Sequence, residues 1–520
     1  MPVSLKPTHS YLLAITLALA ACGGGGGGGS TPTQPTQPGN PADRGFSDPL
    51  AYSSSGNASL SVANEGAALT HHSLNLGGRV IDYTATAGHL IASHPQTSQP
   101  KAAFFYVAYT AKNQDVRTRP VTFFYNGGPG SASVWLHLGS YGPKRLQVGY
   151  PATSQPQPFP LVDNQESLLD TSDLVFVDAI GAGLSQAIAP HTNQTFWGVD
   201  ADAEAFRDFV TRYLAVNQRT ASPKFILGES YGGVRSSVLA DLLEAAGTRM
   251  NGVILLSPIL NYYSNCAVYS PGEANCTGFL PTYANTGAHF RLTNPAQTDY
   301  AAYAQQVRSY AASTYSPAVA NWLGSRLPPS NNLVDQLVGL TGARANLWQA
   351  NLSLHPNTYQ FQLITGTVLG RYDARVTAPQ GSALASEGDP SSTFITSSFA
   401  STIRSYLTSQ LKYTAQTSYA ISSNAIQSWN WQHDGQDLPD TLPDLAAALQ
   451  QNPNLKIMVL HGYNDLATPF HQTELDLARL GNVPGLRIHN YEGGHMMYLD
   501  DASRVRTKAD LAAFYASSLN

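Results

Sequence analysis

The stretch that most constrains the fold is residues 224–246, KFILGESYGGVRSSVLADLLEAA. A short apolar run at its start is followed by apolar residues at helical spacing, which indicates a buried strand and then a helix. Between them, residues 228–232 match the pattern G-x-S-x-G, with Ser230 at the turn. Glycines two positions away leave room for a strained strand-to-helix turn that exposes the serine hydroxyl. An ordinary glycine-rich turn is the alternative, and the flanking strand and helix favour a nucleophile.

A nucleophilic serine needs two partners, because an unassisted hydroxyl reacts poorly near neutral pH. In this kind of fold they follow the serine in the order Asp, His, and Asp465 and His495 meet that order after strand-like runs. The glycines before His495 would let its loop approach Ser230. A turn-capping aspartate and a surface histidine are the alternatives. His461 and His471 lie too near Asp465 in the chain to cross the sheet, so we expect structural roles for them.

Backbone N–H groups near the serine would stabilise the oxyanion of an acyl-transfer reaction. The sequence Asn126-Gly127-Gly128 follows another strand-like run, and its glycines allow close backbone approach. We therefore expect the N–H groups of Gly128 and Tyr231 to form the oxyanion hole, with a plain glycine turn as the alternative.

Alternating strand-like and helical runs indicate the fold class. The chain has 520 residues, which is long enough for a large domain with insertions. Strand-like runs at 174–177, 225–227, 253–256 and 457–460 alternate with helical stretches at 201–216, 234–246, 472–480 and 502–517. This order predicts an α/β protein with a mostly parallel sheet flanked by helices. We assign residues 46–260 and 415–520 to this core and 261–414, which interrupt the rhythm, to an inserted, largely helical cap.

The beginning of the chain reads as a targeting segment. An apolar run at 11–21 follows Lys6, and Leu19-Ala20-Ala21-Cys22 resembles the bacterial lipobox. That resemblance implies a signal peptide at 1–21 and a lipid anchor on Cys22 of an exported lipoprotein in the outer membrane, periplasm or cell surface. A simply secreted protein is the alternative. Residues 22–45 are rich in Gly, Pro and Thr, which predicts a flexible tether.

Cysteine content and charge limit the possible partners. Cys266 and Cys276 lie in a Gly/Pro/Asn-rich loop, and an exported chain meets an oxidising compartment, so we expect them to pair. No second cysteine pair completes a zinc site, and we expect no metal and no other cofactor. Lys and Arg total 29 against 34 Asp and Glu, which gives a net charge of −5 and predicts no nucleic-acid partner.

Several motifs together resemble the serine carboxypeptidases of the peptidase S10 family. They occur in the family's order as NGGPGSAS at 126–133, VDAIGAGLS at 177–185, GESYGG at 228–233, GYNDLATPF at 462–470 and GGHMMY at 493–498. LPTYA at 280–284, GRYDAR at 370–375 and DPS at 389–391 look like patterns of its bacterial members. The resemblance implies an α/β-hydrolase fold with a helical insertion and release of C-terminal residues from peptides. It assigns Ser230 as nucleophile, His495 as general base and acid, and Asp465 as its orienting carboxylate.

The resemblance also assigns Asn126 and Glu229 to the terminal carboxylate of a peptide substrate. A carboxyl group that faces another carboxylate must be protonated, because like charges a few ångströms apart do not both ionise cheaply. Acidic pH should therefore favour binding. The sequence departs from the family at Ser140, where a second glutamate normally shares that proton, and at Ser131, where cysteine is common. The first departure bears on selectivity for a free C-terminus and on the acid preference.

These features predict a serine carboxypeptidase that acts on peptides with a free C-terminus through an acyl-enzyme. The alternative, which the lost glutamate permits, is an esterase or acyltransferase on the same fold. A catalytically inactive surface binding protein is a third interpretation, and the complete set of Ser, Asp, His and oxyanion residues argues against it.

Overall fold

The computed structural model describes residues 42–62, 64–268 and 275–519. The expected signal peptide at 1–21, Cys22 and the tether as far as residue 41 lie outside the described residues. Within the described ranges, no helix combines the length and apolar character that a membrane span requires. Export and lipid anchoring therefore stay predictions from the sequence.

One ten-stranded sheet organises the molecule, with the strand order β16-β15-β11-β10-β5-β8-β4-β3-β2 and β9 paired to β4. Strands β16 to β8 in this order are parallel, and β4, β3 and β2 continue the sheet in antiparallel fashion. The bounds are β2 (Ala67–Leu76), β3 (Arg79–Ser93), β4 (Pro100–Ala111), β5 (Val121–Tyr125), β8 (Asp173–Val177), β9 (Gln186–Ala187), β10 (Lys224–Glu229), β11 (Gly252–Leu256), β15 (Lys456–Gly462) and β16 (Leu486–Tyr491).

The central strands are short apolar runs because both faces of the sheet are covered. Every residue of β5 (VTFFY) and β10 (KFILGE) is buried, as is typical of parallel strands between helix layers. On one face, α2 (Val199–Val216), α3 (Gly232–Ala245) and α11 (Leu442–Gln451) pack on one apolar cluster. On the other, α10 (Pro390–Ser409) and α13 (Asp501–Ser518) contribute to a second cluster. This arrangement confirms the predicted α/β fold class.

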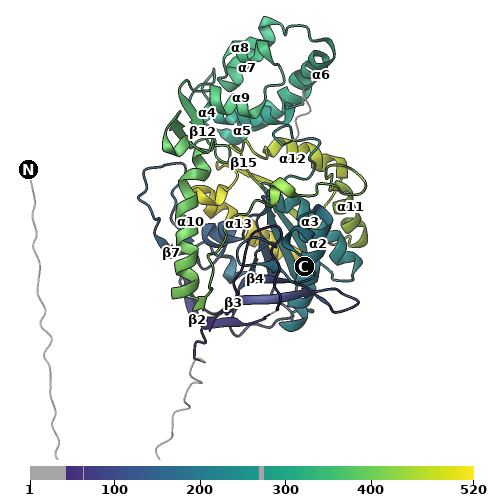
Figure 1. Cartoon of the computed structure of the whole chain (residues 1–520). Coiled ribbons are helices and arrows are strands. Elements are labelled where there is room, and N and C mark those ends of the chain that lie inside the picture. The colour runs from purple at the N-terminus through teal and green to yellow at the C-terminus, as the bar shows by residue number, and fades with distance from the viewer. Residues whose placement is uncertain (1–41, 63, 269–274, 520) are drawn as a thin grey trace, which may run out of the picture. The chain divides into compact units, whose positions relative to one another are not determined.

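Residues 261–414 carry a further group of helices. They are α4 (Leu280–His289), α5 (Tyr300–Tyr310), α6 (Ser316–Ser325), α7 (Asn331–Thr341), α8 (Ala345–Ala350) and α9 (Pro356–Gln362). These helices share their own apolar core, which includes Tyr283, Tyr315 and Trp348, and they gather at one end of the molecule (Figure 1). Helix α10 belongs to the same stretch of chain but runs alongside the sheet (Figure 1), where Phe399 and Ile403 join the core.

Smaller elements complete the fold. They are β1 (Phe46–Ser47), α1 (Val134–Leu136), β6 (Lys144–Leu146), β7 (Leu161–Asp163), β12 (Thr367–Leu369), β13 (Thr377–Pro379), β14 (Tyr413–Thr414) and α12 (Phe470–Leu477). Strand β1 pairs in parallel with β14, so the start of the described chain is held against the segment that follows α10.

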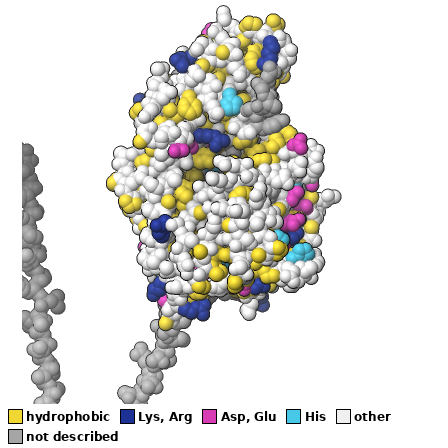
Figure 2. All heavy atoms as spheres, in the orientation of Figure 1, with side chains coloured by type: hydrophobic (Ala, Val, Ile, Leu, Met, Phe, Trp, Pro, Cys, Tyr) yellow, Lys and Arg dark blue, Asp and Glu magenta, His cyan; other side chains and the backbone are white. Residues whose placement is uncertain are grey.

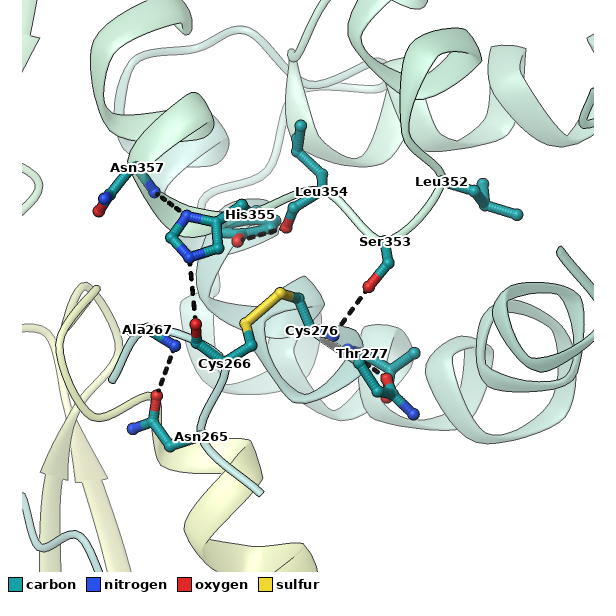
Figure 3. The surroundings of a disulfide bond; sticks show 12 residues. Asn265, Cys266, Ala267, Cys276, Thr277, Leu352, Ser353, Leu354, His355 and Asn357 are labelled. Carbon is teal, nitrogen blue, oxygen red and sulfur yellow. Dashed lines mark hydrogen bonds between the residues drawn. A yellow bond between two sulfur atoms is a disulfide. The ribbon is translucent and has the colours of Figure 1, made fainter. Parts of the chain in front are cut away.

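The Cys266–Cys276 disulfide expected from the sequence is present (Figure 3). The Cys276 N–H donates to Ser353 Oγ at 2.9 Å, and a ring nitrogen of His355 lies 3.1 Å from the Cys266 carbonyl oxygen. Both sulfur-bearing residues are buried. The disulfide closes the loop that leads into the helical group, and the two hydrogen bonds hold this loop against the segment between α8 and α9.

Loss of this disulfide should destabilise the helical group. The cysteines are ten residues apart, and closing a loop of this length stabilises a fold by about 3 kcal/mol in the chain-entropy description. Cys266→Ser/Cys276→Ser should therefore unfold at a lower temperature than the unsubstituted protein, measured by calorimetry on residues 42–520. Reductant should lower the unfolding temperature of the unsubstituted protein but not of the double variant. Two free thiols in the exported protein, detected by mass spectrometry, would contradict the pairing.

Candidate active site

Ser230 lies at the end of β10 with a left-handed backbone, φ +64°. Few side chains adopt this conformation, so the neighbouring structure must hold it. The Ser230 N–H donates to the Leu256 carbonyl at 3.0 Å, and the Ser230 carbonyl accepts from the Gly233 N–H at 2.8 Å. A Cβ on Gly228 would lie 2.3 Å from the Gly232 carbonyl oxygen. The two glycines of the motif therefore permit the turn, as the sequence predicts.

His495 and Asp465, which the sequence places 30 residues apart, form a buried pair. His495 Nδ1 lies 2.7 Å from Asp465 Oδ2, and the two side chains are 2% and 0% exposed. Asp465 Oδ1 accepts from the backbone N–H groups of Ala467 and Thr468 at 2.8 and 3.0 Å. Burial lowers the pKa of His495, but the nearby Asp465 carboxylate raises it by more, so the pKa of His495 is higher than its ordinary value. Asp465 thus orients the imidazole and stabilises its protonated form.

Ser230 and His495 line the same pocket. The residues that line it with them include Asn126, Gly128 and Glu229, so the ends of three strands, β5, β10 and β16, bring residues to one place. Figure 2 shows hydrophobic side chains at a hollow between the upper helices and the rest of the molecule. The serine, the histidine and the residues expected to bind the substrate therefore share one cavity.

The competing histidines have structural surroundings. His461 is buried, its ring nitrogens have no hydrogen-bond partner among the described residues, and burial lowers its pKa to about 4. His471 lies 2.9 Å from Glu474 in α12. Neither residue is among those that line the pocket with Ser230.

The expected oxyanion donors lie on adjacent loops. Gly128 lines the pocket beside Ser230 and has φ +105°, which favours glycine. A Cβ on Gly127 would lie 2.5 Å from the Tyr231 backbone nitrogen, so the two loops are in close contact. The Tyr231 ring is buried, and its centroid lies 5.3 Å from that of Trp429. Tyr231 is not among the residues that line the pocket, so its side chain is not offered to a substrate there.

Glu229 and Asn126 are hydrogen-bonded to each other and buried, each with 2% exposure. Asn126 Nδ2 donates to Glu229 Oε1 at 3.0 Å. Burial raises the pKa of Glu229 to about 7, although the charge of His495 and hydrogen bonds from Tyr498 and Asn126 act in the opposite direction. Glu229 is therefore largely protonated in mildly acidic solution, which suits a site for a carboxylate.

Tyr498 contacts the second oxygen of Glu229, a role that the sequence analysis did not assign. Its hydroxyl donates to Glu229 Oε2 at 2.7 Å. A Cβ on Gly139 would lie 2.4 Å from the Tyr498 ring, so Gly139 leaves room for it. Ser140, which replaces the family's glutamate, is buried, and its carbonyl accepts a hydrogen bond from Asn164. The GGHMMY motif already contained Tyr498, but an aromatic residue there also fits an ordinary core position.

Two further residues hold the catalytic loop. The Tyr372 ring stacks on His495 with centroids 4.7 Å apart and an interplanar angle of 14°. The Tyr372 carbonyl accepts the His495 N–H at 2.5 Å, and a Cβ on Gly494 would lie 2.2 Å from that carbonyl oxygen. Ser257 Oγ donates to the His495 carbonyl at 2.8 Å. The glycine before the histidine thus admits Tyr372 from the inserted segment.

A buried arginine holds the backbone at the end of β5. Arg235 in α3 is 0% exposed, pairs with Asp202 of α2 at 2.6 Å and donates to the Asn126 carbonyl at 2.7 Å. Its guanidinium lies 4.5 Å from the Phe206 ring centroid, which adds a cation–π contact. The helical pattern of residues 234–246 gives no indication of this role.

One group of residues outside the pocket has ligand atoms close enough for a metal ion. These atoms of His433, Asp434 and Asp444 lie within 4.8 Å of one another. His433 contacts Asp444 at 2.9 Å and Asp200 at 2.6 Å through its two nitrogens. The hydrogen bond with Asp444, followed by that with Asp200, raises the pKa of His433 to about 9 against the effect of burial. A protonated imidazole has no free lone pair, so the group acts as an ion-pair link between α2 and α11.

Comparisons with known proteins agree with the motifs. The family described as serine carboxypeptidase matches residues 79–483. Serine carboxypeptidase-like 33 of Arabidopsis thaliana is 26% identical over 149 residues, which span 27% of this chain and 28% of that protein. The match therefore covers less than a third of the curated relative.

Solved structures of low sequence identity also match. A proline iminopeptidase of Mycobacterium smegmatis has a TM-score of 0.36 at 11% identity and covers 83% of this chain and 99% of its own. A soluble variant of the Saccharomyces cerevisiae monoglyceride lipase has a TM-score of 0.37 at 12% identity, with 80% and 92% covered. Because the family match extends over most of the sequence, the chain belongs to the serine carboxypeptidase family.

Proposed function

We propose that the protein is a serine carboxypeptidase that releases C-terminal residues from peptides. The observation that carries the proposal is the buried Glu229–Asn126 pair beside Ser230, because it offers a neutral acid and an amide to a terminal carboxylate. A general esterase has no need for a protonated carboxyl group directly before its nucleophile. The roles that follow are supported by the geometry of the pocket.

Acylation begins when Ser230 Oγ attacks the scissile carbonyl carbon. His495 accepts the hydroxyl proton on Nε2, since its Nδ1 is held by Asp465. The N–H groups of Gly128 and Tyr231 stabilise the tetrahedral oxyanion. His495 then donates the proton to the leaving nitrogen, the C–N bond breaks, and the C-terminal residue departs. Water, deprotonated by His495, hydrolyses the acyl-serine and restores the hydroxyl.

Glu229 and His495 are coupled through their charges. Ionised Glu229 raises the pKa of His495, and protonated His495 lowers the pKa of Glu229. A substrate carboxylate near Glu229 favours the protonated acid, because like charges repel. Binding therefore favours protonated Glu229, which removes the negative charge that raises the pKa of His495 and so favours the neutral imidazole that accepts a proton from Ser230. Substrate recognition and activation of the base are thus linked.

An esterase or acyltransferase is the second candidate function. Ser140 stands where the family's second glutamate would share the proton of Glu229, so selectivity for a free C-terminus rests on fewer acidic groups. Tyr498 takes the position at the second Glu229 oxygen and supplies a neutral donor instead. The burial that keeps Glu229 protonated beside Asn126 favours the carboxypeptidase over the alternative.

The substrate's C-terminus separates these two functions. Residues 42–520 should remove residues stepwise from a free peptide, detected by mass spectrometry, and Ser230→Ala should reduce the rate by a factor of about 10⁴ or more, because the nucleophile is lost. Amidation of the C-terminus should lower kcat/KM by about tenfold or more, since it removes the group that Glu229 and Asn126 bind. Equal rates on free and amidated peptides would favour the esterase or acyltransferase.

Substitution of Tyr498 should shift the pH profile. Activity on free peptides requires protonated Glu229, so kcat/KM should decline as pH rises through about 7. Tyr498→Phe removes a hydrogen bond that favours the ionised carboxylate, so the pKa of Glu229 should rise and the alkaline decline should move to higher pH. The measurement is kcat/KM against pH on a free peptide.

Two variants control this experiment. Tyr515→Phe also loses one buried hydrogen bond of 2.7 Å, to Thr122, but lies on the far helix α13 and should leave the profile in place. Glu229→Gln cannot ionise and should abolish the alkaline decline that belongs to this residue. A decline at the same pH in Tyr498→Phe and the unsubstituted protein would contradict the role of Tyr498.

We also propose that the protein is an exported lipoprotein anchored through Cys22, supported by the sequence LAAC at 19–22 and the Gly/Pro/Thr-rich stretch after it. A bacterial host that expresses the full chain should incorporate labelled fatty acid into the protein. Cys22→Ser should abolish the label and release the protein from the membrane fraction. Label that persists in Cys22→Ser, or a soluble unsubstituted protein, would contradict the anchor.

A further inference from the structure

A second pocket meets the first at Ser230. Both pockets include Gly128, Ser230 and Tyr372, but the second is otherwise lined by a different set of side chains. That set consists of Ile259, Tyr262, Val268, Arg371, Ile426, Trp431, Leu438, Ala467 and Thr468. Glu229 and Asn126 line only the first pocket, so the C-terminal residue of a substrate lies there. The second pocket then faces the substrate residue on the other, acyl, side of the scissile bond.

The walls of the second pocket are mainly apolar and aromatic. Among the described residues that line it, Arg371 is the only charged side chain. Arg371 comes from the GRYDAR segment, and the proposed reaction gives its side chain no role. The pocket therefore combines apolar surface with one fixed positive charge, because arginine stays protonated at all pH values relevant here.

The backbone of Arg371 is anchored while its guanidinium is left for a ligand. The Arg371 N–H donates to Asp389 Oδ1 at 2.9 Å, and its carbonyl accepts from the Leu466 N–H at 3.0 Å. The guanidinium carbon lies 5.9 Å from the Tyr372 ring centroid. Among the described residues, no ion pair of the Arg371 guanidinium is found. The neighbouring Asp389 carboxylate caps α10 by accepting the Ser391 N–H at 3.0 Å.

A half-buried cation without an acidic partner is costly unless a ligand supplies the opposite charge. Resting on the proposed carboxypeptidase function, we propose that the second pocket binds the penultimate side chain of the substrate and that Arg371 selects an acidic one. The methylene groups of a glutamate side chain fit the apolar walls, and its carboxylate matches the planar guanidinium. Arg371 is thus a specificity-determining residue.

The test uses three peptides that differ only in the penultimate residue, Glu, Gln or Lys, each followed by the same C-terminal leucine. At about pH 5.5 the glutamate is ionised while Glu229 is largely protonated. The unsubstituted protein should cleave the Glu peptide with a kcat/KM about fivefold higher than the Gln peptide, an effect of the size expected for a partly exposed ion pair. The ratio should decrease as salt is raised.

Three variants make the outcome decisive. Arg371→Gln should bring the Glu/Gln ratio to about one, and Arg371→Glu should prefer the Lys peptide, a gain that misfolding does not produce. Arg344→Gln removes an exposed arginine that does not line the pocket and should keep the unsubstituted ratio. A Glu/Gln ratio of one or less in the unsubstituted protein, or the same ratio above one in Arg371→Gln, would overturn the inference. Failure of the unsubstituted protein to shorten any of the three peptides would instead refute the proposed carboxypeptidase function.

Discussion

The left-handed backbone of Ser230 is the constraint on which the site depends. A non-glycine residue in this region costs on the order of 1–3 kcal/mol, and the parallel sheet sustains it. The N–H of Ser230 is held by the end of β11, and the loop after β5 lies against the backbone of Tyr231. Strands β5, β10 and β11 are adjacent and in register, so the same ladder that buries their apolar side chains fixes the Ser230 turn and the Gly128 loop together.

A second consequence of this packing is that Glu229 is buried directly before the nucleophile. An acid in this position loses the water that would stabilise its charge, and Asn126 and Tyr498 restore only part of that stabilisation. Arg235 of α3 holds the Asn126 backbone, and Tyr372 of the inserted segment holds His495. These two residues therefore set the positions of Asn126 and His495 around Glu229. The electrostatic coupling between Glu229 and His495 makes the base sensitive to what occupies the carboxylate site.

The sequence predicted the fold class and singled out the candidate catalytic residues because both depend on local patterns. Apolar runs such as those of β5 and β10 are recognisable without tertiary information, and the glycine motif identifies Ser230. Tyr498, Tyr372 and Arg235 could not be assigned in this way, since their roles arise from contacts between segments far apart in the chain. A buried arginine on a helix and a tyrosine beside a histidine have no periodicity or spacing that separates them from core residues.

The two pockets at Ser230 recognise charge by different physical means. In the first pocket, the terminal carboxylate of the substrate is bound by Glu229, which must be protonated. The affinity for the terminus therefore changes with pH near the pKa of Glu229, about 7. On the acyl side, Arg371 stays charged at any such pH, so its attraction for an acidic side chain depends on the ionisation of the substrate alone. A peptide that is bound on both sides thus meets one pH-dependent contact and one pH-independent contact. At high pH the protein then loses activity because ionised Glu229 no longer binds the terminal carboxylate, while the preference for an acidic penultimate side chain is unchanged.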